Sequence, residues 1–231
     1  GLVEQLEQTQ QQLSGEMNVL AGTLTVLAPS NISTGLLQPM WSGFIKAYPD
    51  IKLELILSNS VESMLSSGAD LALRIGPQES SMLYQKRLGW LKTVLVATPE
   101  YLASNAEPLN INALELHRLI GTNTLATWSM VNSKTKIKQE IRPRFATQVN
   151  DIKLATQLVC DHLGISVLPT SEVESLINAG TLIQILPSWQ GPRRDLYTVW
   201  PSGKLLSARA KCLKEYMEEF IQQSNVNISD C

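Results

Sequence analysis

The sequence predicts an α/β protein in which parallel strands alternate with crossover helices, divided into two lobes. Between residues 23 and 75, three strand-like segments alternate with two helix-like segments, the order typical of right-handed crossovers in a parallel sheet. The third strand, residues 70–75, places its large aliphatic side chains on one face, and a Gly-Pro pair ends it. The apolar run at residues 94–97 ends at Thr98 and Pro99 and passes into a helix-like segment, which indicates a lobe boundary.

The first lobe is expected to contain most of these alternating elements. Its main helix places Met40, Trp41 and Phe44 at helical spacing, and Pro49 ends it. Residues 51–57 alternate as a strand, and the polar residues 58–60 precede a short helix. The expected elements, in order, are strand 23–28, helix 36–48, strand 51–57, helix 61–67, and strands 70–75, 83–88 and 90–97.

The second lobe is expected to start at residue 99. Asn150 and Asp151 form a cap for a helix, and Pro169 ends a buried strand. Residues 128–131 and 137–148 are expected to form an antiparallel pair, and residues 195–200 are expected to lead the chain back toward the first lobe. The other expected elements are helices 99–104 and 111–114, strand 117–122, helix 152–161, strand 163–169, helix 171–179, strand 182–186 and a final amphipathic helix, 207–223.

Composition excludes several classes of protein. The 231 residues carry a net charge of −2 and a pI near 5.8, whereas nucleic-acid binding requires a basic face. The apolar runs are far shorter than the roughly 20 residues of a membrane span. Residues 1–22 contain no Lys or Arg and no long apolar run, so no signal peptide is expected. Three scattered cysteines do not make a disulfide framework, and a cytoplasmic protein is expected.

Residues 2–20 contain a coiled-coil seam with alternating spacings of four and three, interrupted by two polar residues, and Gln fills much of the remainder. The seam residues are Leu2, Leu6, Thr9, Leu13, Glu16 and Leu20. Two interpretations stay open: an amphipathic lead-in, or the end of a longer dimerising helix. The chain begins at a glycine rather than a methionine, so we expect it to be a fragment or a processed product.

Five motifs together resemble one family. They are D-L-A-L-R-I-G at residues 70–76, V-L-V-A-T-P-E-Y-L-A at 94–103, G-T-L-T-V-L-A-P at 22–29, F-I-K-A-Y-P-D-I at 44–51 and L-G-I-S-V-L-P at 163–169. Each motif is weak by itself, but in this order and spacing they resemble the effector-binding domain of LysR-type transcriptional regulators. The resemblance extends over nearly the whole chain.

The resemblance implies two Rossmann-like lobes, similar to type 2 periplasmic binding proteins, joined by two hinge strands around an effector cleft. It assigns residues 1–21 to the end of a linker helix, 22–98 and 200–231 to lobe I, and 99–199 to lobe II. A winged helix-turn-helix domain, absent from this chain, would bind DNA. The resemblance also implies a homodimer or homotetramer in which helix 36–48 lies against the partner's second lobe. The aromatic residues Trp41, Phe44 and Tyr48 could cover that interface or face their own core.

Polar residues near the ends of predicted strands are the candidate effector-binding residues, because open parallel sheets bind ligands at the carboxyl ends of their strands. A second interpretation, helix capping, applies to the serines and asparagines. Helix N-termini and one arginine favour a small anionic effector, most simply a carboxylate. The candidates are Ser30, Asn31, Ser58, Asn59, Ser60, Arg74, Thr98, Thr124, Thr127, Trp128, Asn150 and Trp200, of which Thr98 and Trp200 are expected at the hinge crossings.

No catalytic residue, cofactor or metal site is predicted. The sequence contains no phosphate-binding, nucleophile-elbow or zinc-protease motif. Cys160 lies in an apolar helix, where an inert buried thiol is the usual interpretation and a redox role is the alternative. A sensing domain of a regulator is therefore the first hypothesis. A solute-binding protein of a transport system is the alternative, and an enzyme would need convergent titratable residues.

Overall fold

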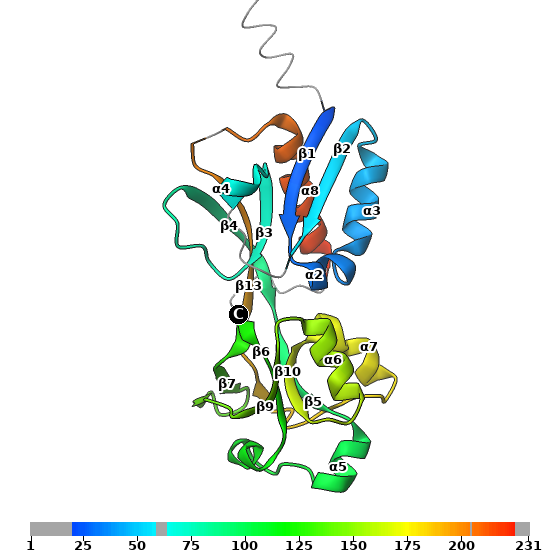
Figure 1. Cartoon of the computed structure of the whole chain (residues 1–231), viewed down its shortest axis with the longest axis vertical. Coiled ribbons are helices and arrows are strands. Elements are labelled where there is room, and N and C mark those ends of the chain that lie inside the picture. Colours follow the sequence, from blue (N-terminus) through cyan, green and yellow to red (C-terminus); the bar gives the residue numbers. More distant parts are fainter. Residues whose placement is uncertain (1–19, 59–63, 204, 225–231) are drawn as a thin grey trace, which may run out of the picture. The chain divides into compact units, whose positions relative to one another are not determined.

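The computed structural model describes residues 20–58, 64–203 and 205–224, and the chain divides into two compact units. Unit 1 combines the chain up to Ser33 with Leu37–Gly89 and the chain from Leu196 onward, and unit 2 contains Thr34–Leu36 and Trp90–Asp195. Figure 1 follows the chain through both units. The predicted coiled-coil seam lies outside the described residues except for Leu20, which is exposed.

Unit 1 is built on a five-stranded sheet with the order β2-β1-β3-β13-β4. β1 pairs in parallel with β2 on one side and with β3 on the other, as the strand–helix alternation predicts. β13 pairs antiparallel with β3, so the sheet is mixed. The strands are β1 Gly22–Ala28, β2 Ile51–Leu57, β3 Leu71–Ile75, β4 Leu83–Leu91 and β13 Arg194–Pro201, and the helices are α2 Ser30–Thr34, α3 Gln38–Ala47, α4 Met64–Ser67 and α8 Ala208–Gln223.

The helices of unit 1 bury the faces that their spacing predicts. In α3, Met40, Trp41 and Phe44 are buried, and Pro39 stands in the first turn, where its missing N–H costs nothing. α8 begins after Ser207, whose hydroxyl accepts from the amide of Ala210 at 3.3 Å. The ring of Phe44 meets that of Tyr216 edge-on at 5.5 Å, which joins α3 to α8.

Unit 2 contains two sheets, one of five strands in the order β11-β5-β10-β6-β9 and one of three in the order β12-β7-β8. In the larger sheet, β10 is parallel to β6 and antiparallel to β5, and β6 is parallel to β9. The strands are β5 Thr93–Ala97, β6 Leu119–Thr122, β7 Trp128–Asn132, β8 Lys138–Ile141, β9 Phe145–Val149, β10 Ile165–Pro169, β11 Ile183–Gln184 and β12 Trp189–Gln190. The helices are α5 Pro99–Asn105, η1 Ile111–Leu116, η2 Asn123–Leu125, α6 Ile152–Cys160 and α7 Thr170–Asn178.

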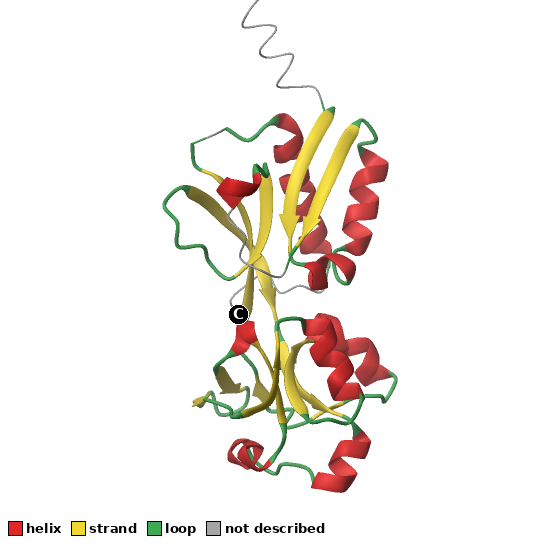
Figure 2. Ribbon diagram, in the orientation of Figure 1, coloured by secondary structure: helices red, strands yellow, loops and turns green. Residues whose placement is uncertain are grey.

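The larger sheet of unit 2 is covered on both faces. Figure 2 shows α6 and α7 on one face, and the buried side chains of Ala155, Val159 and Val173 pack there. On the other face, Leu95 and Val167 join a second cluster with Trp128. Because both faces are covered, every residue of β5 and β10 is buried.

The structure differs from the sequence prediction in sheet membership, in one strand and in the points where the chain passes between the units. β5 belongs to the sheet of unit 2, where it pairs with β10, although residues 90–97 were expected to complete the first lobe. The expected strand 137–148 is two strands in different sheets, because Pro143 separates β8 from β9 and lacks the N–H that a ladder needs. The chain passes between the units within β4, at residues 89 and 90, and within β13, at residues 195 and 196, rather than after residues 98 and 199.

Candidate functional site

The carboxyl ends of three adjacent strands bring four of the predicted residues to one edge of the unit 1 sheet. The amide of Ser58, directly after β2, donates to the carbonyl oxygen of Ala28 at the end of β1, at 3.0 Å. Ser30 and Asn31 stand in the first turn of α2, one residue beyond the end of β1. The pairing of Leu27 with Ala72 places Arg74 at the level of Pro29, beside them. This edge, formed by Ser30, Asn31, Ser58 and Arg74, is called the carboxyl edge of unit 1.

Arg74 is the charged group of this edge. Its side chain is only 6% exposed, and its Nη1 donates to the carbonyl oxygen of Leu73 at 3.4 Å. Burial of a guanidinium is unfavourable unless polar groups surround it, and each of the four residues interacts with other groups of the chain. The edge therefore combines hydroxyl and amide side chains with one buried cation. Asn59 and Ser60, predicted for the same edge, lie outside the described residues.

A second set of predicted residues lies at the corresponding edge of unit 2. Thr122 and Val149 are paired at the carboxyl ends of β6 and β9, so the segments that follow them begin side by side. Thr127 is half-buried, and Asn150 is exposed directly after β9. Asp151, rather than Asn150, caps α6, accepting from the amide of Leu154 at 2.8 Å. Thr124 stands in η2 after β6, and its side chain is outside the described part of the structure.

Trp128 lies inside the core of unit 2. Its side chain is 1% exposed, and its ring meets that of Phe145 edge-on at 5.5 Å. It belongs to the buried cluster that contains Leu95, Leu114 and Val167. The side chain is therefore part of the core beneath the edge, which favours a packing role over direct contact with a ligand.

Thr98 lies at the opposite end of the unit 2 sheet from Asn150, because β5 runs antiparallel to β10. It caps α5, accepting from the amide of Tyr101 at 3.2 Å, and its Oγ1 lies 2.9 Å from Nδ1 of His162. Nε2 of His162 lies 3.3 Å from a carboxylate oxygen of Glu100. A hydroxyl, an imidazole and a carboxylate in a row also form nucleophilic triads. The Thr98 side chain, however, is only 1% exposed and is occupied as a cap, which favours a structural role.

Trp200 also lies away from the carboxyl edge of its sheet. Val199 pairs with Ala72 on the antiparallel strand β3, so the chain beyond Val199 continues toward the amino ends of β1 and β3. The Trp200 ring lies 6.2 Å from that of Tyr84 and 5.5 Å from Nζ of Lys214. The structure thus gathers Ser30, Asn31, Ser58 and Arg74 in unit 1 but does not bring Trp200 to them.

Two features near the points where the chain passes between units were not singled out from the sequence. Arg194, in β13, is only 7% exposed, and burial lowers its pKa to about 10, so it remains charged at neutral pH. The guanidinium of Arg193 lies 4.5 Å from the ring centroid of Trp90, where a cation–π contact forms. The strand expected at residues 195–200 begins one residue earlier, at Arg194, so this arginine was not considered as a buried strand residue.

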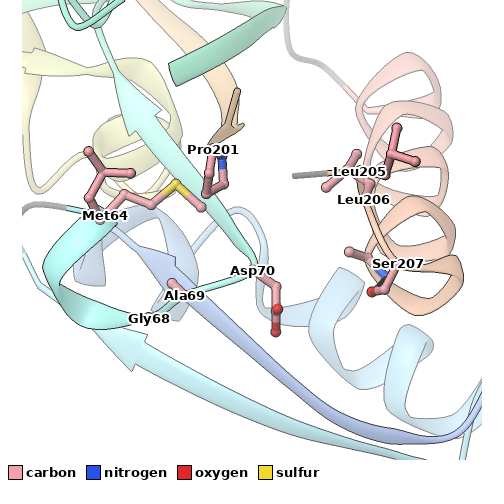
Figure 3. A pocket seen from close by; sticks show the side chains of 10 residues that line it. Met64, Gly68, Ala69, Asp70, Pro201, Leu205, Leu206 and Ser207 are labelled. Carbon is pink, nitrogen blue, oxygen red and sulfur yellow. Dashed lines mark hydrogen bonds between the residues drawn. The ribbon is translucent and has the colours of Figure 1, made fainter. Parts of the chain in front are cut away.

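A pocket of about 270 Å³ in unit 1 contains none of the predicted site residues. Figure 3 shows Met64 and Pro201 on one side, Leu206 and Ser207 at the start of α8 on the other, and Asp70 between them. Asp70 accepts a hydrogen bond from the amide of Thr25 at 3.0 Å. The pocket lies at the amino end of β3, opposite the carboxyl edge of unit 1.

Within the described part of the chain, no three of the His, Cys, Asp and Glu side chains are grouped as metal ligands would be. None of the described helices has the length and apolar character of a membrane span.

Comparison with known proteins identifies relatives of one kind. The family model described as "LysR substrate binding domain" matches residues 18–222. The transcriptional regulator PtxR of Pseudomonas aeruginosa is 28% identical over 202 residues, a match that covers 87% of this chain and 65% of PtxR. A probable transcriptional regulator, LtrA of Klebsiella pneumoniae, is 26% identical, and 99% of this chain and 75% of LtrA are covered. The chain thus spans about two thirds of the length of PtxR.

Solved structures of transcriptional regulators have a fold similar to that of this chain. The full-length virulence activator AphB of Vibrio cholerae superposes with a TM-score of 0.82 and 26% identity, covering 95% of this chain and 75% of AphB. The regulatory domain of CrgA from Neisseria meningitidis gives a TM-score of 0.72 and 25% identity, covering 88% of this chain and 98% of that domain. Regulatory domains of this type have the two-lobe fold similar to periplasmic binding proteins, so the predicted fold class is confirmed.

Proposed function

Because the chain belongs to the LysR substrate binding domain family, we propose that it senses a small anionic effector, most simply a carboxylate. The observation that carries this proposal is the carboxyl edge of unit 1, where three strand ends bring a buried arginine beside polar side chains. The relatives named above are transcriptional regulators rather than enzymes or transport proteins, which supports a regulatory role over the solute-binding alternative.

The chemistry of the edge favours an anion. A guanidinium forms charge-assisted hydrogen bonds with a carboxylate that are stronger than neutral ones, and it can present two donors at once. Ser30 and Ser58 add hydroxyl groups, and Asn31 adds an amide. α2 is only five residues long, so its dipole adds little, and Arg74 is the principal source of attraction. A position of the ligand between the two lobes stays a prediction from the family resemblance.

The remaining parts of the regulator belong to the same proposal. The signal is passed to a DNA-binding domain outside this chain, since the chain itself has a net charge of −2. A cytoplasmic location follows from a role at DNA. Cys160 is half-buried, and burial raises the pKa of its thiol, which disfavours the reactive thiolate and supports the inert interpretation.

Isothermal titration calorimetry tests the effector proposal. Titration with aliphatic mono- and dicarboxylates is expected to give a saturable binding heat for at least one compound. Arg74→Ala should weaken that binding about tenfold or more, because a hydrogen bond to a charged group contributes roughly 1.5–3 kcal/mol. Arg74→Gln keeps most of the side-chain volume and serves as a second variant if Arg74→Ala does not fold, as judged by circular dichroism.

Lys211→Ala is the matched control, because it removes one positive charge from an exposed position of α8 in the same unit. Its affinity should equal that of the wild type. If folded Arg74→Gln binds the same carboxylate as tightly as the wild type, the role given to Arg74 is wrong. If no aliphatic carboxylate binds the wild-type protein, the proposed effector class is wrong.

We also propose that the protein self-associates. The aromatic residues of helix 36–48, which could have covered a dimer interface, do not support this proposal. Trp41 and Phe44 are buried in unit 1, and the Tyr48 ring lies 5.0 Å from that of Phe44, so these residues serve their own core. The exposed large apolar residue of α3 is Ile45, which is 52% exposed. Support for a dimer therefore comes from the family and from Ile45.

Sedimentation velocity at micromolar concentration is expected to show a dimer or tetramer. Ile45→Glu should shift the distribution toward monomer, because a charge would be buried in the proposed interface. Met82→Glu, at an exposed residue of unit 1 outside α3, is the control and should leave the distribution unchanged. A wild-type protein that stays monomeric as its concentration rises would rule out this association.

A further inference from the structure

Unit 2 contains a pocket of about 320 Å³ that none of the proposed functions uses. Its apolar lining consists of Leu114, Leu119, Ile141 and Pro143. The first two are buried members of the unit 2 core, and Ile141 packs against that core. The pocket lies where β6 begins, at the opposite end of the sheet from Thr127 and Asn150. It is therefore separate from the predicted site residues of this unit that follow β6 and β9.

His117 supplies a polar group that lies within hydrogen-bonding distance of the Tyr101 hydroxyl. The buried hydroxyl of Tyr101 accepts the backbone N–H of Arg118 at 3.0 Å, so its own hydrogen is available to Nδ1 of His117, 3.3 Å away. In the tautomer in which the Tyr101 hydroxyl donates, Nδ1 accepts and the ring proton resides on Nε2. Burial lowers the pKa of His117, which favours this neutral form at pH 7. His117 also lines the pocket, so it adds an N–H donor to the apolar lining.

The charged residues of the pocket are predominantly basic. Arg142 and Arg144, on the segment that joins β8 to β9, both line it, and Glu115 of η1 is the acidic member. With His117 neutral, two positive charges stand against one negative charge. The two walls are also tied together, since the side-chain amide of Gln139 in β8 donates to that of Asn112 in η1 at 2.6 Å. The pocket is thus a braced cavity whose lining combines apolar side chains with a net positive charge.

We propose that this pocket binds a small carboxylate with an aromatic or branched apolar body, at a site distinct from the proposed effector site. A cavity of about 150 Å³ already accommodates benzene, so this one has room for a ring and a carboxylate. The apolar body packs against Leu114, Leu119 and Ile141. The carboxylate is bound by the guanidinium groups of Arg142 and Arg144 and by the Nε2–H of His117.

Benzoate is the probe, and heteronuclear NMR of the full chain is the measurement, because it reports which residues respond. Benzoate is expected to shift the backbone amides of residues 114–119 and 141–144 and the imidazole of His117 in a saturable manner. The double variant Arg142→Gln/Arg144→Gln should weaken this binding about tenfold or more, since it removes both charge-assisted contacts. The single variant His117→Phe should weaken it less.

The control Lys134→Gln/Lys138→Gln removes the same charge from exposed positions nearby and should bind benzoate as the wild type does. Benzamide, which has the same ring without the charge, should bind more weakly than benzoate. Equal binding of benzamide would overturn the proposed recognition of a carboxylate, and absence of shifts at residues 114–119 and 141–144 would overturn the site itself. Because the readout is local, either result leaves the proposal for Arg74 untouched.

Discussion

Replacing Trp128 with alanine is expected to destabilise unit 2 by about 3–5 kcal/mol, the usual cost of removing a large buried aromatic side chain. Trp128 is almost fully buried and belongs to a buried cluster with Leu95, Leu114 and Val167, which come from three different elements. These residues are held by regular secondary structure, so they can only partly fill the cavity that the alanine substitution leaves. The loss should appear as a lower urea midpoint in circular dichroism.

Trp128→Phe is the matched variant, because it retains an aromatic ring that can meet Phe145. It should cost clearly less than the alanine variant and should leave carboxylate binding unchanged. A Trp128→Ala protein that is as stable as the wild type would contradict the core assignment. If the Trp128→Phe protein folds but no longer binds the effector, that result would support the direct contact between Trp128 and the effector that the sequence predicts.

Replacing Gly164 with alanine is the second change with a large expected effect. Its φ of +157° is one that L side chains rarely adopt, and an added Cβ would overlap the carbonyl oxygen of Arg118. That oxygen accepts the amide of Ile165 at 2.9 Å, so it cannot withdraw without breaking the pairing of β10 with β6. We expect a loss of about 3 kcal/mol or more, because backbone strain and a lost ladder contact add together.

Gly203→Ala is the control for this substitution, since a Cβ there meets no atom within 4 Å. Its urea midpoint should stay close to that of the wild type. Comparable midpoints for the two alanine variants would show that the close approach of Gly164 to Arg118 is not a constraint. The predicted constraint also explains physically why glycine follows leucine in the L-G-I-S-V-L-P motif.

Three elements of unit 1 could be predicted closely because local signals delimit them. Pro49 precedes β2, which matches its expected bounds, and β3 and α8 each begin one residue later than expected. Sheet membership was harder to predict. β5 consists entirely of buried residues, so its sequence carries no alternation, and its partner β10 lies far along the chain. Pairing between strands that are far apart in the chain cannot be recognised from a short stretch of sequence.

The sequence could place those candidate site residues whose positions depend only on the order of parallel strands. Strand ends of parallel neighbours meet, so Ser58 and Arg74 could be placed near Ser30 from the chain order alone. Thr98 and Trp200 could not be placed, because each follows or ends a strand whose direction is set by antiparallel pairing. Arg194 was missed because burial of an arginine depends on its neighbours in space, not on those in sequence.

Because unit 1 is made of segments on both sides of unit 2 in the chain, the two units cannot be completed in the order in which they begin during synthesis. Apart from residues 34–36, unit 2 is one continuous stretch, whereas unit 1 needs β13 and α8 from the end of the chain. β13 is also the strand that separates β3 from β4 in the sheet. A nascent chain therefore completes unit 2 while the first unit still has two unjoined pieces of sheet, reversing the usual N-terminal-first order. Until Arg194–Pro201 emerges, the edges of β3 and β4 that it will cover stay open to pairing with other chains.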